Sequence, residues 1–199
     1  MTGKTHNRGQ KFPAEPLTKD EVLALMSVCS KRAPTGIRDR ALICTLWRGQ
    51  LRISEALALK VADFDPVACT LRVLRGKGKK ARVAVIDPQA ADVLTAWLEC
   101  RKTLGLNGHR PIFCTLQGKP LSTAQIREML PRRARKAGIE KRVHAHGLRH
   151  TGASELAQEG VTLLDIQHQL GHSSAATTNK YLHQLNPVAR AERIRARTW

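Results

Sequence analysis

The 199-residue sequence contains few aromatic residues and few acidic ones. Phe, Trp and Tyr make up 4% of the chain, and Tyr181 is its single tyrosine. Asp and Glu number 16 against 34 Lys and Arg, which gives a formal net charge of +18 at pH 7. A folded core does not need this excess, and self-repulsion works against the compact state. The charge therefore predicts a polyanionic partner, with nucleic acid favoured over an anionic membrane surface.

The sequence also lacks long apolar runs and paired cysteines. No run approaches the roughly 20 apolar residues of a membrane-spanning helix. Residues 1–12 hold no apolar stretch of the secretory-signal type, and we expect a flexible basic arm over residues 1–16. Because no CxxC pair occurs, reduced packing cysteines of a cytoplasmic protein are expected rather than zinc ligands or disulfides. The five cysteines are Cys29, Cys44, Cys69, Cys100 and Cys114.

The hydrophobic pattern predicts a mainly α chain with a small antiparallel β-sheet, an α+β fold. Thr18 and Glu21 form a capping-box pattern before a first helix, which Pro34-Thr35-Gly36 interrupts. Strands over 70–74 and 82–86 flank a glycine- and lysine-rich turn at 76–80, which predicts a hairpin with a basic tip. Further helices are expected over about 37–48, 53–59, 88–104, 122–136, 148–158, 163–170, 175–183 and 188–197.

Basic and imidazole side chains stand before Tyr181 in the sequence, at helix starts, at the hairpin tip and at a short spacing from Tyr181. His172 precedes it by nine residues. His146 and Arg149 are three residues apart, so they share one face at the start of a helix. Arg52 stands at a helix entry, and Lys77 stands on the hairpin tip. The candidate catalytic residues are therefore Arg52, Lys77, His146, Arg149, His172 and Tyr181.

These residue types suit metal-free phosphoryl transfer. Arginine forks bind the non-bridging oxygens of a phosphodiester and stay charged at any relevant pH. Preorganised donors stabilise the charge that builds up there in the transition state. A tyrosine hydroxyl, with an ordinary pKa of about 10, needs help to become a nucleophile. A histidine can accept its proton, and a lysine can protonate the departing sugar oxygen.

In order and spacing, five motifs resemble the tyrosine recombinase family (phage integrase, Xer-like). They are LRISEAL with Arg52, GKGKK with Lys77, HGLRH with His146 and Arg149, LGH with His172, and NKYLH with Tyr181. The resemblance runs from about residue 17 to residue 183 and implies the tyrosine recombinase catalytic-domain fold. We place the catalytic domain at 17–186 and a C-terminal segment, which would dock on a neighbouring subunit, at 187–199.

The resemblance implies a role for each site residue. Arg52 and Arg149 would clamp the scissile phosphate. Tyr181 would attack it, leaving a 3′-phosphotyrosyl link and a free 5′-hydroxyl. Lys77 would be the general acid for the 5′ oxygen, and His146 would assist proton transfer from the tyrosine. His172 would donate a hydrogen bond to the phosphate.

The resemblance also implies no cofactor and no metal, because the phosphodiester energy is kept in the enzyme–DNA link. The implied partners are double-stranded DNA and a homotetramer on two DNA sites. Since only about sixteen residues precede the first helix, we expect no separate core-binding domain, as in the short fimbrial phase-variation invertases. An accessory DNA-binding protein would then compensate. The expected location is the cytoplasm, at the nucleoid, with a bacterial, phage or plasmid gene.

Several assignments have alternatives. Lys79 and Lys80 share the hairpin tip with Lys77, and all three would also suit backbone phosphates. Glu55 either orients an arginine or is a plain helix-face carboxylate. His150 is interpreted as structural, and Asp63-Phe64-Asp65 as a turn rather than a metal site. His144 and His183 are expected to flank the site.

The function has alternatives too. Type IB topoisomerase-like relaxation uses the same chemistry. A DNA-binding regulator without catalysis would explain the charge but has no use for a nucleophile and its proton-transfer partners. A nucleic-acid packaging protein explains the charge and not the ordered motifs. Integration, excision, inversion and resolution depend on how the DNA sites are arranged, so neither the outcome nor the target site follows from this sequence.

Overall fold

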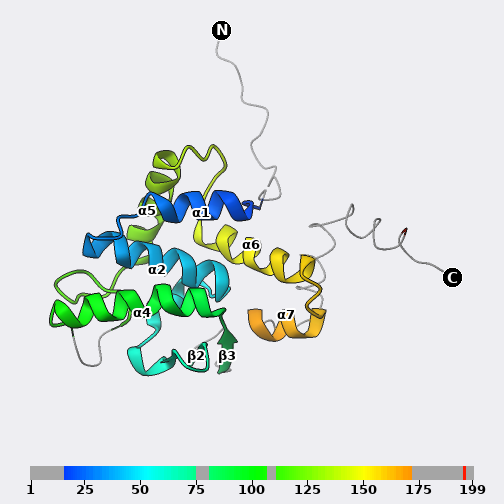
Figure 1. Cartoon of the computed structure of the whole chain (residues 1–199), viewed down its shortest axis with the longest axis horizontal. Coiled ribbons are helices and arrows are strands. Elements are labelled where there is room, and N and C mark those ends of the chain that lie inside the picture. The colour runs from blue at the N-terminus through cyan, green and yellow to red at the C-terminus, as the bar shows by residue number, and fades with distance from the viewer. Residues whose placement is uncertain (1–15, 75–80, 107–110, 172–194, 196–199) are drawn as a thin grey trace, which may run out of the picture.

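The computed structural model describes residues 16–74, 81–106, 111–171 and 195 of the chain. As expected, these residues form mainly helices and one small antiparallel sheet (Figure 1). The helices are α1 (Lys19–Ser27), α2 (Pro34–Arg48), α3 (Ile53–Ala58), the 3₁₀ turn η1 (Val61–Asp63), α4 (Pro88–Thr103), α5 (Thr123–Lys136), α6 (Ala145–Gln158) and α7 (Leu163–Leu170). The strands are β1 (Phe64–Asp65), β2 (Thr70–Val73) and β3 (Arg82–Val85).

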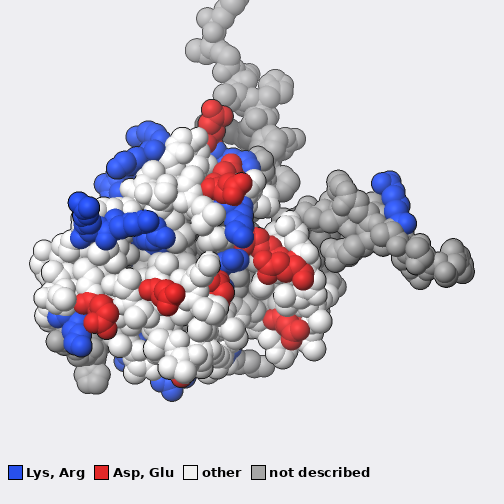
Figure 2. Space-filling view, viewed as in Figure 1, with Lys and Arg blue, Asp and Glu red and all other residues white. Residues whose placement is uncertain are grey.

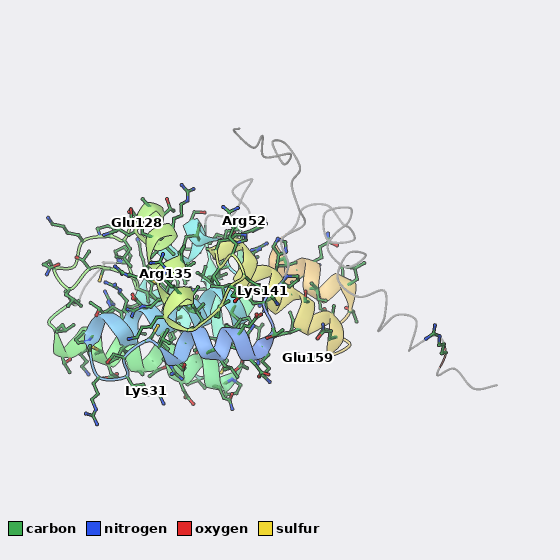
Figure 3. The ribbon with its side chains drawn as sticks, turned by 90° about the horizontal axis from the view of Figure 1, so that it is seen from above. Lys31, Arg52, Glu128, Arg135, Lys141 and Glu159 are labelled. Atoms are coloured by element: carbon green, nitrogen blue, oxygen red, sulfur yellow. The ribbon has the colours of Figure 1, made fainter. Side chains whose placement is uncertain are left out.

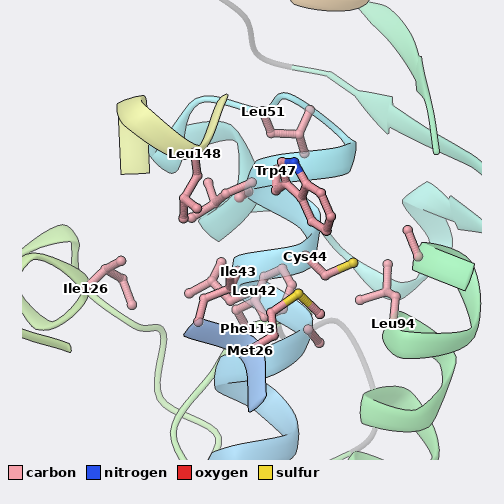
Figure 4. Packing of buried hydrophobic residues seen from close by; sticks show 14 of the residues in the cluster. Met26, Leu42, Ile43, Cys44, Trp47, Leu51, Leu94, Phe113, Ile126 and Leu148 are labelled. Carbon is pink, nitrogen blue, oxygen red and sulfur yellow. The ribbon is translucent and has the colours of Figure 1, made fainter. Parts of the chain in front are cut away.

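Helix α2 is the centre of the fold. Leu42, Ile43 and Leu46 on it are fully buried, and α4 and α6 both pack along it. Figure 4 shows side chains from α1, α4 and the 111–114 segment closing around α2, among them Met26 and Phe113. A helix that is apolar on nearly every side is stable only when other elements surround it. Helices α1, α3, α4 and α6 therefore pack directly on α2, whereas α5 packs on α1, α3 and α6, and α7 packs on β3 and α6.

One glycine lets α6 approach α2 closely. A Cβ atom on Gly152 would lie 2.0 Å from the carbonyl oxygen of Trp47, a separation that no side chain tolerates. The close approach brings the first half of α6 beside the turn that follows α2. That half of α6 carries His146 and Arg149, and the turn leads into Arg52. Packing between two helices thus joins two motifs that lie about a hundred residues apart.

The predicted hairpin strands are confirmed, with Thr70 paired to Val85 and Val73 paired to Arg82 in antiparallel register. Strand β1 was not predicted, because two residues are too few to show an alternating pattern. Its partner is β2, so the sheet order is β1-β2-β3. The turn at 76–80 and the expected helices over 175–183 and 188–197 lie outside the described residues.

Two predicted helix starts were wrong. Helix α2 begins at Pro34 rather than near residue 37, because proline has the fixed φ and the missing N–H that suit a first helical position. Helix α6 begins at Ala145 rather than residue 148, because His144 caps it: Nδ1 of His144 accepts a 2.6 Å hydrogen bond from the backbone N–H of Gly147. In the described part of the chain, no helix combines the length and the apolar character of a membrane span.

Candidate active site

Three arginines converge on one buried carboxylate, that of Glu55. Both terminal nitrogens of Arg82 donate hydrogen bonds to it, Nη1 to Oε1 over 3.0 Å and Nη2 to Oε2 over 2.8 Å. Arg52 donates from Nη1 to Oε1 and from its backbone N–H to Oε2, each over 2.8 Å. Nη1 of Arg149 lies 3.8 Å from Oε2. Glu55 is therefore the residue that gathers the cationic groups of the site.

The electrostatics of Glu55 follow from these contacts. Burial by itself raises the pKa of a carboxyl, but the hydrogen bonds from Arg82 and the Arg52 backbone outweigh it and lower the pKa of Glu55 to about 2. The carboxylate is therefore charged at neutral pH. Its single negative charge faces three guanidinium groups, so the cluster keeps a positive excess. Such an excess in a poorly solvated place attracts an anion.

Arg52 occupies the N-cap position of α3, and 28% of its side chain is exposed. Figure 3 shows it at the upper edge of the ribbon in that view. One side of its guanidinium is held by Glu55, which fixes its direction while the rest of the side chain reaches the surface. A guanidinium held in this way can meet an incoming phosphate with little loss of conformational entropy.

Arg149 is buried on α6, with 2% of its side chain exposed. Nη1 donates to the carbonyl oxygen of Gln50 over 2.5 Å, and Nη2 donates to the carbonyl oxygen of Leu170 over 2.7 Å. The side chain thus ties α6 to the turn before α3 and to the last residue of α7. Arg52 and Arg149, predicted together from distant motifs, are brought to the same carboxylate.

Sequence reasoning did not identify the role of Gln50. Its φ is +46°, in the left-handed region that non-glycine residues rarely adopt. This conformation turns its carbonyl towards Arg149, while its side chain bonds the carbonyl of Trp47 over 3.0 Å and the side chain of Gln169 over 2.7 Å. A glutamine in a helix–loop junction carries no signal for such a conformation, which only the packed neighbours reveal.

His146 lies in the first turn of α6, on the face of the helix that also carries Arg149. Burial is the main cause that lowers its pKa below the usual 6.5, and the positive charges of Arg149, His144 and Arg52 lower it further. A neutral imidazole can accept a proton. His150 packs its ring edge-on against His146, with 4.2 Å between the ring centroids. The structural role predicted for His150 therefore includes holding this imidazole.

Arg82 and Gln169 are further residues of the site that sequence reasoning missed. Arg82 was interpreted only as the start of a strand, and Gln169 only as part of an expected helix. Nε of Arg82 donates to the carbonyl oxygen of Gln169 over 3.2 Å. The Gln169 side chain bonds both the N–H and the carbonyl of Val85, over 2.9 Å and 2.7 Å. Together they fasten α7 to the edge of β3.

The other predicted site residues lie outside the described part of the chain. These are Lys77 with its neighbours Lys79 and Lys80, His172, Tyr181 and His183. Gly171, which directly precedes His172, is described and ends α7 in the left-handed conformation at φ 61°. The chain therefore turns at the residue before His172, next to the carbonyl of Leu170 that Arg149 holds.

The turn predicted over Asp63-Phe64-Asp65 is in part a strand, because Asp63 ends η1 whereas Phe64–Asp65 form β1. Both aspartates nevertheless accept backbone bonds at neighbouring turns. Asp63 accepts the backbone N–H of Lys60 over 2.9 Å. Asp65 accepts the N–H groups of Val67 and Ala68, each over 2.9 Å. Within the residues that the structure describes, no group of three or more His, Cys, Asp or Glu side chains is arranged to hold a metal ion.

The surface charge is uneven. On the face seen in Figure 2, basic side chains gather over α5 and the adjoining ends of α1 and α2, and acidic ones are spread in separate groups over α1, α4, α6 and α7. One member of the basic run 132–136 is not a free surface charge, because Arg133 donates to buried Asp39 over 2.8 Å. Arg38 donates to the same carboxylate over 2.8 Å. These pairs hold the core together, while Arg132, Arg135 and Lys136 remain exposed.

A sequence model described as the phage integrase family matches residues 15–186. The chain belongs to the phage integrase family. Among curated relatives, the tyrosine recombinase XerC of Chlamydia muridarum (strain MoPn / Nigg) is 37% identical over 180 residues, which cover 88% of this chain and 57% of the relative. The chain spans little more than half the length of the curated relatives it matches.

Solved structures agree with this family assignment. The crystal structure of XerA recombinase has a TM-score of 0.82 and 29% identity, covering 96% of this chain and 68% of that one. XerH site-specific recombinase, bound to a palindromic difH substrate in a post-cleavage complex, has a TM-score of 0.74 and 28% identity, covering 92% and 53%. The mainly helical arrangement with a small antiparallel sheet is thus the fold of this phage integrase domain.

Proposed function

We propose that this protein is a site-specific tyrosine recombinase that cuts and rejoins double-stranded DNA through Tyr181. The observation that carries the proposal is the meeting of Arg52 and Arg149 at Glu55, 3.8 Å or less from its oxygens, with His146 in the first turn of the helix that carries Arg149. The family membership and the DNA-bound state of XerH support it. The exposed basic residues suit the phosphate backbone, which supplies much of the affinity of such proteins.

In the proposed reaction, Oη of Tyr181 attacks the scissile phosphorus and the bond from phosphorus to the 5′ oxygen breaks. His146 takes the phenolic proton, and Lys77 gives a proton to the leaving 5′ oxygen. Arg52 and Arg149 stabilise the charge on the non-bridging oxygens, assisted by a hydrogen bond from His172. One phosphodiester is exchanged for another, so the step needs no oxidant, nucleotide or metal. The 5′-hydroxyl of a partner strand then reverses it.

The wider assembly is part of the same proposal. We place the protein on two DNA sites as a homotetramer, in a bacterial cytoplasm at the nucleoid, with residues 187–199 docking on the neighbouring subunit. Residues 1–16 would contact DNA as a basic arm. An accessory DNA-binding protein would add affinity. Gel filtration with and without a two-site DNA, followed by light scattering, measures the assembly directly.

The covalent adduct is the decisive test. The protein is mixed with nicked duplexes that carry sequence from around its own gene, and a denaturing gel separates protein–DNA adducts from free protein. We expect an adduct with the native chain and none with Tyr181→Phe, which keeps the ring and lacks the nucleophile. A native chain that binds such DNA and gives no adduct would contradict the proposal and favour a regulator. Relaxation of supercoiled plasmid without strand exchange would instead identify a topoisomerase.

A further inference from the structure

Arg82 is the strongest partner of Glu55, although it belongs to none of the predicted catalytic motifs. It makes a two-bond fork with the carboxylate, whereas Arg52 contributes one guanidinium bond and Arg149 stays at 3.8 Å. Only 12% of the Arg82 side chain is exposed. A two-bond arginine–carboxylate pair in a poorly solvated place is both strong and geometrically specific. Arg82 therefore decides how much of the Glu55 charge remains for the other two arginines.

The guanidinium groups of the cluster compete for the single negative charge of Glu55. Glu55 holds one negative charge, which Arg82 neutralises with two hydrogen bonds. Without Arg82, both carboxylate oxygens would lose a partner, and a buried unpaired charge is costly. Arg52 and Arg149 are the nearest cations that could replace it. A guanidinium drawn fully onto Glu55 would be poorly placed to bind a phosphate.

We propose that Arg82 is a positioning residue of the DNA cleavage step: it compensates Glu55 so that Arg52 and Arg149 keep their charge directed at the scissile phosphate. The proposal rests on the recombinase function proposed above and names one more residue of that site. Arg82 would touch neither the nucleophile nor the phosphate. It acts through Glu55.

A second contact gives Arg82 a fixed position. Its Nε donates to the carbonyl oxygen of Gln169 on α7, and its side chain packs against Gly171, where a Cβ atom would lie 2.7 Å from Cδ of Arg82. The guanidinium is therefore held from two sides, by α3 and by the end of α7. Arg82 can neutralise Glu55 without moving towards a bound anion, which distinguishes it from the more exposed Arg52.

The test compares four variants by the rate of adduct formation on the nicked duplex at saturating DNA. Arg82→Met removes the charge and keeps much of the apolar stem. Arg82→Lys keeps the charge and loses the fork. Glu55→Gln removes the charge that Arg82 compensates, and the double variant Glu55→Gln/Arg82→Met removes both charges. Arg72→Met is the matched control, because Arg72 lies exposed on the neighbouring strand β2 and bonds the carbonyl of Ala62.

We expect Arg82→Met to form adduct roughly tenfold more slowly or worse, with its DNA dissociation constant within about threefold of the native one. The double variant should be at least about fivefold faster than Arg82→Met, because the uncompensated carboxylate is gone. Arg82→Lys should stay within about fivefold of the native rate. Arg72→Met should change binding by no more than the loss of one exposed charge.

Different failures have different meanings. A native chain that forms no adduct would contradict the proposed recombinase function itself. A native chain with adduct and an equally fast Arg82→Met would overturn the role of Arg82 alone. A slow Arg82→Met that Glu55→Gln does not speed up would overturn charge compensation and leave Arg82 as a packing residue. Thermal melts check folding; if Arg82→Met does not fold, Arg82→Gln, which keeps a donor without the charge, carries the same expectations.

Discussion

Arg149 donates a 2.5 Å hydrogen bond to the carbonyl oxygen of Gln50, a residue held at φ +46°. The two residues lie 99 positions apart in the chain. The bond fixes the buried arginine of the candidate site to the turn that leads into Arg52. Backbone strain at Gln50 is therefore coupled to the position of a candidate catalytic side chain.

Gln50→Gly should be more stable than Gln50→Ala, which reverses the usual order of the two residues. Both variants lose the side-chain bonds to Trp47 and Gln169, but only glycine adopts φ +46° without steric cost. The expected difference is about 1 kcal/mol, measured by urea unfolding. Equal stabilities, or a more stable Gln50→Ala, would show that the turn relaxes out of the left-handed region.

Glu55 should make the free energy of unfolding depend on pH in the acidic range. Its pKa falls from the usual 4.5 to about 2 on folding, so its stabilisation is complete above pH 4.5 and is lost as the pH falls towards 2. Between pH 5 and pH 3 the native chain should lose about 2 kcal/mol more than Glu55→Gln does. Urea unfolding at the two pH values measures the difference.

Glu21 gives the control for that experiment. Burial raises the pKa of its carboxyl, but bonds from the Thr18 backbone and from Lys141 outweigh this and lower it. The side chain is 26% exposed, so solvent screens the interaction more than at Glu55. Glu21→Gln should therefore flatten the acid dependence less than Glu55→Gln. A larger effect at Glu21 would contradict the central place of Glu55.

Gly152→Ala should destabilise the protein strongly. The added Cβ would meet the carbonyl oxygen of Trp47 at 2.0 Å, so α6 must move away from α2. We expect a loss of about 2–3 kcal/mol in thermal or urea unfolding, despite the better helix propensity of alanine. Adduct formation should fall as well, because α6 carries His146 and Arg149.

Gly138→Ala is the matched control for this substitution. Gly138 has φ +69°, but a Cβ atom there meets nothing within 4 Å. Its cost should be limited to about 1 kcal/mol of backbone strain, with adduct formation unchanged. If the two variants lost the same stability, the close approach of α2 and α6 would not be the constraint that positions α6.

His146 should titrate below the usual pKa of 6.5. Burial disfavours the imidazolium first, and the charges of Arg149, His144 and Arg52 add to it. A histidine-ring NMR titration, assigned with His146→Gln, measures this value. Arg52→Gln removes one of the neighbouring charges and should raise the pKa of His146. A His146 that is protonated at pH 7 would be a poor acceptor for the tyrosine proton.

Much of the candidate site could be predicted from the order and spacing of the sequence motifs. Arg52, His146 and Arg149 were predicted to act together, and the fold brings Arg52 and Arg149 to one carboxylate. Glu55 was left open between an arginine partner and a plain helix-face residue, and its contacts settle this in favour of the first. Short-range patterns sufficed here, because a capping position and a three-residue spacing already fix where side chains stand on a helix.

Arg82, Gln50 and Gln169 could not be found in the same way. A strand arginine, a turn glutamine and a helix glutamine are ordinary residues in their local sequence. Their importance comes from partners that are 27 to 119 positions away. The two wrong helix starts have a local cause instead, since a proline and a histidine acted as helix-initiating residues where other roles were assigned to them.

The sequence by itself determined the mainly helical fold with its hairpin, the basic character of the protein and the set of chemically competent residues. These depend on hydrophobic period, composition and motif order, all of which are properties of neighbouring positions. Only the tertiary structure decided that one buried carboxylate gathers three arginines. That arrangement depends on Gly152, which allows α6 to approach the surrounded helix α2, and on Arg82, which reaches from the sheet to α3 and α7. The arginines pair with Glu55 because a buried charge without a partner is costly.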